Sequence, residues 1–102
     1  MAKEDSFAEN EHPGIILKEE FLDALGISQN RLAVAAGVPR SRINQIVKGK
    51  RSITASTSIR IGRALGMSDF FFLTLQIDYD KLAALRSAGD LSDVVPIERK
   101  AA

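Results

Sequence analysis

Short amphipathic segments, each followed by a glycine, constrain the fold of this 102-residue chain more than any other feature. The glycines stand at positions 26, 37, 49, 66 and 89, and the segments before them repeat apolar side chains at helical spacing. Glycine readily adopts the left-handed conformation that ends a helix. The pattern therefore predicts five helices and no strand, an all-α fold.

Capping residues indicate where these helices begin. Pro13 and Pro39 suit the first turn of a helix, where a backbone N–H is not needed. Ser28, Thr54 and Ser68 are predicted N-caps, because a side-chain oxygen at that position accepts a hydrogen bond from a free amide. The predicted inner face of the first helix consists of Leu17, Phe21, Ala24 and Leu25.

The two ends of the chain differ in composition from its middle. Residues 1–11 are mostly charged or small and are predicted to form a flexible acidic segment, and residues 12–88 form one helical domain. Residues 89–102 lack a helical period and contain Pro96, which predicts an extended or disordered tail. Its VVPI run could dock as a strand, although such short runs more often stay undocked.

Several classes of protein are disfavoured by composition. The chain has no cysteine and one histidine, so we expect no disulfide, no metal site and no cofactor. No apolar run approaches the length of a membrane span, and the polar N-terminus is unlike a signal peptide, which predicts a cytoplasmic protein. His12 lies in no catalytic motif and is predicted to cap a helix; we expect no catalytic residue and no enzyme activity.

The charges are distributed unevenly along the chain, although the net charge is only +1. Residues 1–27 hold two bases and seven acids, and residues 67–102 hold four bases and six acids. Residues 28–66 hold eight bases and no acid. A cationic block of this kind suits a polyanion, although a basic stretch is often only a solvated helical surface. We call these eight bases the cationic block: Arg31, Arg40, Arg42, Lys48, Lys50, Arg51, Arg60 and Arg63.

Residues 29–48, QNRLAVAAGVPRSRINQIVK, read as two short helices joined by a tight turn. Ala33 is small enough for the helices to approach each other, and Gly37 tolerates the dihedral angles of the turn. The inner seam is predicted to consist of Leu32, Val38, Ile43 and Ile46. Hairpins of two helices without a DNA role satisfy the same spacing, so the outer face discriminates better. It presents side chains that pair with base edges and phosphates: Arg40, Ser41, Arg42, Asn44, Gln45 and Lys48.

With these motifs the chain resembles the Cro/repressor class of helix-turn-helix proteins (the XRE family), and within it the HigA-like (VapI-like) antitoxins. The resemblance covers about residues 12–82 and includes the runs HPGIILKEEFLDALGISQNRLA and GVPRSRINQIVKGKRSITASTSIRIGRALG. It implies a five-helix domain whose helices two and three form the helix-turn-helix. It also implies binding to the operator of the protein's own operon and neutralisation of a RelE/HigB-like toxin that cleaves mRNA.

The resemblance assigns roles to particular residues. Arg40 and Ser41, with Gln45 one turn later, would face base edges in the major groove, with Arg42 and Asn44 beside them on the same helix. The predicted phosphate contacts are Gln29 and Asn30 at the start of the second helix and the basic loop of Lys48, Lys50, Arg51 and Ser52. The acidic first helix would offer the toxin Glu19, Glu20 and Asp23. The alternative interpretation is that these carboxylates, which lie beside Lys18, are simply part of the solvated helix surface.

The chain departs from the family pattern at a few positions. Phe72, Leu73 and Thr74 stand where Trp-Leu-Asn is common, and Ser56 and Ser58 replace the usual Asp and Ala of the fourth helix. The Ser58 hydroxyl is predicted to lie near the core, where it needs a helical carbonyl as its partner. These differences affect the expected dimer surface and partner more than the expected DNA binding.

The fifth helix is predicted to join two subunits. Three consecutive phenylalanines, at positions 70–72, point about 100° apart on a helix, so at least one of them should emerge from the core. A single short recognition helix reads few bases, which favours a homodimer on double-stranded DNA. The predicted interface consists of Phe71, Phe72, Leu75, Tyr79 and Leu82. Two other functions remain open: a free-standing repressor without a toxin, and an interaction protein that never binds DNA.

Overall fold

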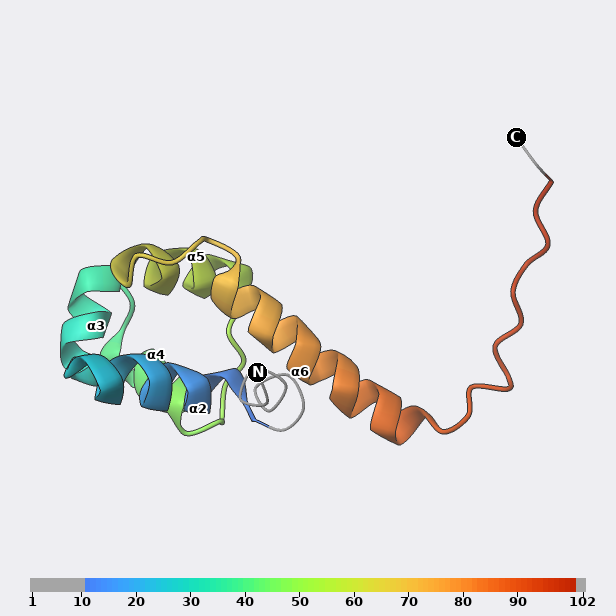
Figure 1. The fold of residues 1–102 in the computed structure, drawn as a ribbon, viewed down its shortest axis with the longest axis horizontal. Helices are drawn as coiled ribbons and strands as arrows, with labels where there is room; N and C mark the ends of the chain where they lie inside the picture. The colour runs from blue at the N-terminus through green and yellow to red at the C-terminus, as the bar shows by residue number, and fades with distance from the viewer. Residues whose placement is uncertain (1–10, 101–102) are drawn as a thin grey trace.

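Residues 11–100 are described by the computed structural model, and throughout this range the regular elements are helical (Figure 1). They are α2 (Pro13–Ile16), η1 (Leu17–Asp23), α3 (Gln29–Ala36), α4 (Arg40–Val47), α5 (Ala55–Ala64) and α6 (Phe71–Ala88). Because α2 and η1 form one continuous rod, the described residues contain five helical rods and no strand, and the all-α prediction is confirmed. Most of the predicted N-terminal segment, residues 1–10, lies outside the described range.

The first helix turns a different face to the core than its sequence predicts. Leu17 is fully buried as expected, but the next deeply buried residue is Leu22, whereas Leu25 is 60% exposed. The cause is the π-helical geometry of η1, in which residue i bonds to residue i+5 and the apolar face moves by one position. The prediction that Ala24 and Leu25 face inward is therefore wrong.

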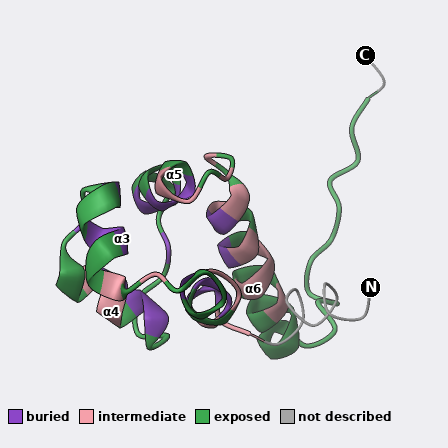
Figure 2. Cartoon of the chain, turned by 60° about the vertical axis from the view of Figure 1, so that its left-hand side comes forward, coloured by how far each residue is buried: buried purple, intermediate pink, exposed green. Residues whose placement is uncertain are grey.

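The core lies where all five rods converge. Ile43, Ile46 and Ile61 are completely buried, as is Phe72, which lies at the centre of an aromatic cluster. The ring of Phe72 contacts those of Phe21 and Phe71 edge to face, with centroids 5.1 and 5.0 Å apart. Edge-to-face pairs of this kind stabilise a core beyond the area that they bury. In Figure 2 the buried residues of α3, α4, α5 and α6 turn toward this common centre.

Helix α2 approaches α4 backbone to backbone. A Cβ atom on Gly14 would lie 1.7 Å from the carbonyl oxygen of Ile46 and 3.1 Å from Nδ1 of His12. No side chain other than glycine's fits in this space, so the first turn of α2 rests directly on the last turn of α4. The position of α4 is thus fixed from behind by a contact that leaves its opposite face free.

His12 caps this first turn, which confirms its predicted role. Its Nδ1 accepts a hydrogen bond of 2.9 Å from the amide of Gly14, and its ring contacts Tyr79 edge to face with centroids 5.2 Å apart. Burial lowers the pKa of His12 below its ordinary value, against a smaller opposing effect of Asp80. Nδ1 accepts a hydrogen bond only while it carries no proton, so the cap requires the neutral imidazole.

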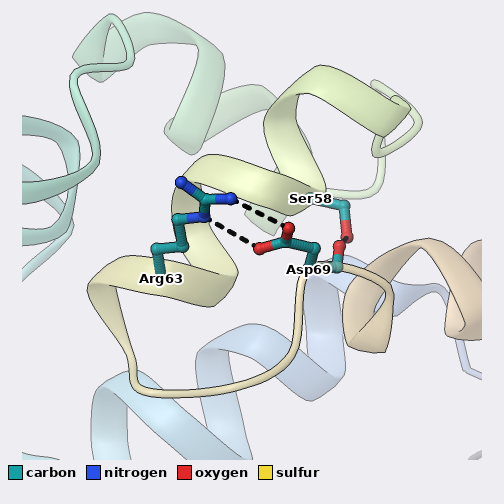
Figure 3. A network of polar contacts seen from close by, with 3 residues as sticks. All are labelled: Ser58, Arg63 and Asp69. Carbon is teal, nitrogen blue, oxygen red and sulfur yellow. Dashed lines mark hydrogen bonds and ion pairs between the residues drawn. The ribbon is translucent and has the colours of Figure 1, made fainter.

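Helix α6 is capped from α5 and not by its own N-terminal residues. Ser58 Oγ accepts a hydrogen bond of 2.9 Å from the amide of Leu73 in the first turn of α6. The same hydroxyl donates to the carbonyl of Asp69 at 2.7 Å (Figure 3). Ser68 was the predicted cap, but α6 begins at Phe71 without a side-chain cap from its flanking residue. That prediction is wrong because Ser58 already bonds one of the free amides of the first turn. Ser58 was expected to bond a helical carbonyl. The carbonyl that it bonds, that of Asp69, lies instead in the turn before α6.

The C-terminal half of α6 and the segment after it extend away from the other helices (Figures 1 and 2). Phe72 and Gln76, near its N-terminus, are the buried residues of α6. In the tail, Val94, Val95 and Ile97 are 62%, 76% and 86% exposed. The VVPI run therefore does not dock onto the described helices.

We predict that Gly14→Ala destabilises the fold, although alanine is normally the better helix former. The added Cβ would collide with the Ile46 carbonyl, which is backbone and moves only if α2 separates from α4. Chemical denaturation should show a loss of about 2 kcal/mol or more. Glu19→Ala, an exposed change on the same rod, should stay within about 0.5 kcal/mol of the wild type. Equal stability of the two variants would contradict the close approach.

We also predict that the His12 cap makes stability depend on pH. The pKa of His12 is lowered in the folded state, so its contribution is present above the unfolded value of about 6.5 and is lost as pH falls through the folded value. The free energy of unfolding should therefore decrease between about pH 7.5 and pH 5.5. His12→Asn keeps a capping group that does not titrate and should flatten this dependence. The same slope in both proteins would refute the assignment.

Candidate DNA-binding surface

The two helices predicted to form a helix-turn-helix meet through a tight left-handed turn. Ser28 caps α3 by accepting a hydrogen bond of 3.0 Å from the amide of Arg31. Helix α3 ends at Gly37, whose φ of 68° and ψ of 37° are left-handed, and α4 begins after Pro39. The predicted seam is confirmed, because its four residues are at most 5% exposed: Leu32, Val38, Ile43 and Ile46.

Helix α4 presents a polar face on the side away from the core. Its buried residues are Ile43, Ile46 and Val47. At about 100° per residue, the side opposite this face carries Ser41, Gln45 and Lys48, which are all exposed. The two arginines flank it: Arg40 is exposed and Arg42 is half-buried. The described outer face of α4 thus combines hydroxyl, amide and cationic groups and has no carboxylate.

Asn44 links α4 to α3, the helix before it. Its Nδ2 donates a hydrogen bond of 3.2 Å to Oε1 of Gln29, and both side chains are half-buried. This bond joins a predicted base contact to a predicted phosphate contact. It braces α4 against the N-terminus of α3, whereas a contact from Asn44 to a base stays a prediction.

The loop after α4 is tied to both α4 and α6. Nε of Arg51 donates to Oε1 of Gln45 at 2.8 Å, so the loop orients the amide that faces outward. The amide of Ile53 donates to Oε1 of the buried Gln76 at 2.8 Å, and Nε2 of Gln76 donates to Asp80 at 3.0 Å. Gln76 was not predicted from the sequence; the available signal was a polar residue four positions after Phe72, on the same inner side of the helix.

The cationic block keeps most of its charge available. Among the described residues, Arg63 is the member of the block that forms a salt bridge, with its Nε and Nη2 at 2.9 and 3.1 Å from the Asp69 carboxylate (Figure 3). These hydrogen bonds hold the pKa of Asp69 below its ordinary value. The predicted phosphate contacts in the loop are all exposed: Lys48, Lys50, Arg51 and Ser52. Solvated cations without acidic neighbours are well suited to displace the counterions of a polyanion.

One of the residues predicted to form the dimer interface is placed elsewhere by the structure. Phe72 is 0% exposed and packs inside its own subunit, so it has no surface to offer a second one and that assignment is wrong. Phe70 is 68% exposed, which confirms that one of the three phenylalanines must emerge. The rest of the predicted interface is half-buried: Phe71, Leu75, Tyr79 and Leu82. Exposed Ile77 and Leu85 were not in the prediction.

The acidic residues of the first helix lie at its surface. Glu19 and Asp23 are exposed, and Glu20 is half-buried. Asp23 accepts a hydrogen bond of 2.7 Å from Lys18, which leaves the carboxylate paired but accessible. The described residues contain no group of three or more potential metal ligands, and none of the described helices is long and apolar enough to cross a membrane.

Comparison with known proteins identifies the family. A helix-turn-helix family model matches residues 17–72, from the start of η1 to the first turn of α6. Virulence-associated protein I of Dichelobacter nodosus is 39% identical over 90 residues, which cover 88% of this chain and 83% of that protein. An addiction module antidote protein of the HigA family from Coxiella burnetii is 37% identical with a TM-score of 0.77, covering 87% of this chain and 99% of that one.

A second similar structure contains DNA. It is a Pseudomonas aeruginosa protein in complex with its 18 bp operator, 35% identical to this chain with a TM-score of 0.80, covering 88% of this chain and 97% of that one. These similarities extend over nearly the whole described fold and include both helices of the turn. The chain belongs to the helix-turn-helix family and, within it, to the HigA-like antitoxins.

Proposed function

We propose that this protein is a sequence-specific DNA-binding antitoxin that represses its own operon. The observation that carries the proposal is the polar outer face of α4, which is exposed, free of carboxylates and held by buried contacts on its other side. The operator complex of the Pseudomonas aeruginosa protein supports the same use of this fold. A HigA-family relative supports the antitoxin role.

In the proposed complex, α4 lies in the major groove. Arg40, Ser41 and Gln45 read base edges, because guanidinium and amide groups form paired hydrogen bonds with purines. Phosphates on either side are held by Gln29 and Asn30 at the N-terminus of α3, and by the loop after α4. The loop contributes Lys48, Lys50, Arg51 and Ser52, and Arg42 and Asn44 extend the contact along α4.

We expect a homodimer, because the outer face of α4 is small. Helix α4 has eight residues and reaches only a few base pairs, so specificity requires a second copy about 34 Å away, one turn of DNA. We propose that α6 makes the contact, because its C-terminal half extends from the body of the protein (Figure 1) and the helix leaves Ile77 and Leu85 about half exposed. Half-buried Phe71, Leu75, Tyr79 and Leu82 adjoin them.

The proposed protein partner is a basic RelE/HigB-like toxin that cleaves mRNA. The rod of α2 and η1 carries exposed or half-buried carboxylates at Glu19, Glu20 and Asp23. These residues precede residues 28–66, the range that holds all the bases of the cationic block. An acidic surface steers a basic partner and does not compete with DNA for the same residues. Both activities place the protein in the cytoplasm, with its operon and its toxin.

We predict that substitutions at base contacts and at phosphate contacts have different effects on binding to the operator, the DNA upstream of the coding sequence. Gln45→Ala should weaken operator binding about 10-fold, since a good amide–base pair discriminates by about 1–3 kcal/mol, and should hardly affect scrambled DNA. Lys50→Ala should weaken both DNAs and reduce the slope of log affinity against log salt by about 0.9. Fluorescence anisotropy over a salt series measures both quantities.

Lys81→Ala is the matched control, an exposed base on α6 outside the cationic block, and should leave the salt slope unchanged. Operator affinity that is independent of salt would exclude DNA binding by this surface. Identical behaviour of Gln45→Ala and Lys50→Ala would show that the contact assignment is wrong.

We also predict that the protein forms a complex with the product of the adjacent reading frame and restores growth of cells that express it. Glu19→Lys should weaken this complex at least 10-fold, because it reverses a charge on the proposed contact, and should leave operator binding intact. Asp93→Lys makes the same change in net charge on the exposed tail and should have no effect. If growth is not restored, the antitoxin role fails while the repressor role stands.

A further inference from the structure

We propose that Arg60 of α5 is a positioning residue for base recognition: it holds the C-terminus of α3 and so sets the angle at which α4 meets DNA. The inference rests on the proposed function, because it concerns how α4, the helix proposed to contact the bases, is held in place. By sequence, Arg60 is simply one of the eight bases of the cationic block. Its contacts in the fold assign it a different role.

The guanidinium of Arg60 bonds the last carbonyl of α3. Its Nη1 donates to the Ala36 oxygen at 3.3 Å in a half-buried position. The last carbonyls of a helix have no partner inside the helix. The two amides of the turn, those of Gly37 and Val38, bond instead to the carbonyls of Val34 and Ala33. The Ala36 carbonyl is thereby left for Arg60, which acts as a C-cap supplied from another helix.

The same guanidinium also lies close to the turn itself. A Cβ atom on Gly37 would lie 2.9 Å from Nη1 of Arg60, so the arginine rests directly on the glycine that reverses the chain. Its positive charge lies at the C-terminal, negative end of the α3 dipole, which favours the contact. Helix α4 begins at Arg40, only three residues after Gly37. A shift of the end of α3 is therefore passed to α4 with little chain between them to absorb it.

The surroundings of Arg60 separate it from the proposed DNA contacts. It lies in a pocket formed by α3 and α5, whose other lining residues are Ala35, Ala36, Ser56, Ile59, Arg63 and Ala64. None of the lining residues is a predicted base or phosphate contact. A phosphate contact and a positioning residue have different signatures: the first changes the salt dependence of binding, the second changes the discrimination between base pairs.

The test compares Arg60→Met with Lys50→Met, because methionine keeps an apolar stem and removes the cationic group in both. Affinity is measured over a salt series for the operator and for an operator with one base pair changed beneath α4. Arg60→Met should lower the ratio of the two affinities about 5-fold and leave the salt slope at the wild-type value. Lys50→Met should lower the slope by about 0.9 and leave the ratio unchanged.

Rescue by a conservative variant distinguishes positioning from general loss of stability. Arg60→Lys retains a positively charged donor on a long stem, which should bond the Ala36 carbonyl and recover at least half of the lost discrimination. Circular dichroism confirms that each variant is folded, and if Arg60→Met is not, Arg60→Gln takes its place. A reduced salt slope for the variant would show that Arg60 contacts phosphate, and an unchanged ratio would also overturn the proposal. If the wild type does not discriminate between the two DNAs, the proposed function fails before this inference is reached.

Discussion

The contact between the backbones of α2 and α4 is the constraint on which the reading surface depends. Gly14 lies so close to the Ile46 carbonyl that a single added carbon would occupy the same space as the oxygen. Such a contact is stiffer than side-chain packing, since no rotamer change can relieve it. With the seam to α3 and the bond from Asn44 to Gln29, it fixes α4 on every side except the one that faces solvent.

Most of the basic residues and all the acidic residues lie in different parts of the chain. The cations of α3, α4 and the following loop have no acidic neighbour in the sequence. Arg63 does pair with a carboxylate, that of Asp69, and this salt bridge links α5 to the turn before α6. Phosphate attraction supplies affinity without sequence information, and in the proposed complex the amide and guanidinium groups of α4 supply the discrimination between bases. All the acidic residues lie outside residues 28–66, the part of the chain that holds both helices of the turn and the following loop.

The sequence predicts the parts of the fold that depend on neighbouring residues. The caps at Ser28 and Thr54 and the left-handed turn at Gly37 are local, and all three are confirmed. The parts that depend on distant residues are not predictable in this way. The π-helical shift that buries Leu22, the cap that Ser58 provides by accepting a hydrogen bond from α6, and the burial of Phe72 arise only when the helices pack.

An NMR titration of the backbone amides with the operator DNA tests directly whether α4 presents its outer face to DNA. The largest chemical-shift changes at low DNA ratios should occur at Ser41, Gln45 and Lys48 and in the loop through Ser52. Glu19 and Asp23 on the first helix should change little. Largest changes on the first helix, with α4 unaffected, would contradict the claim that α4 is held from behind in order to present its outer face to DNA.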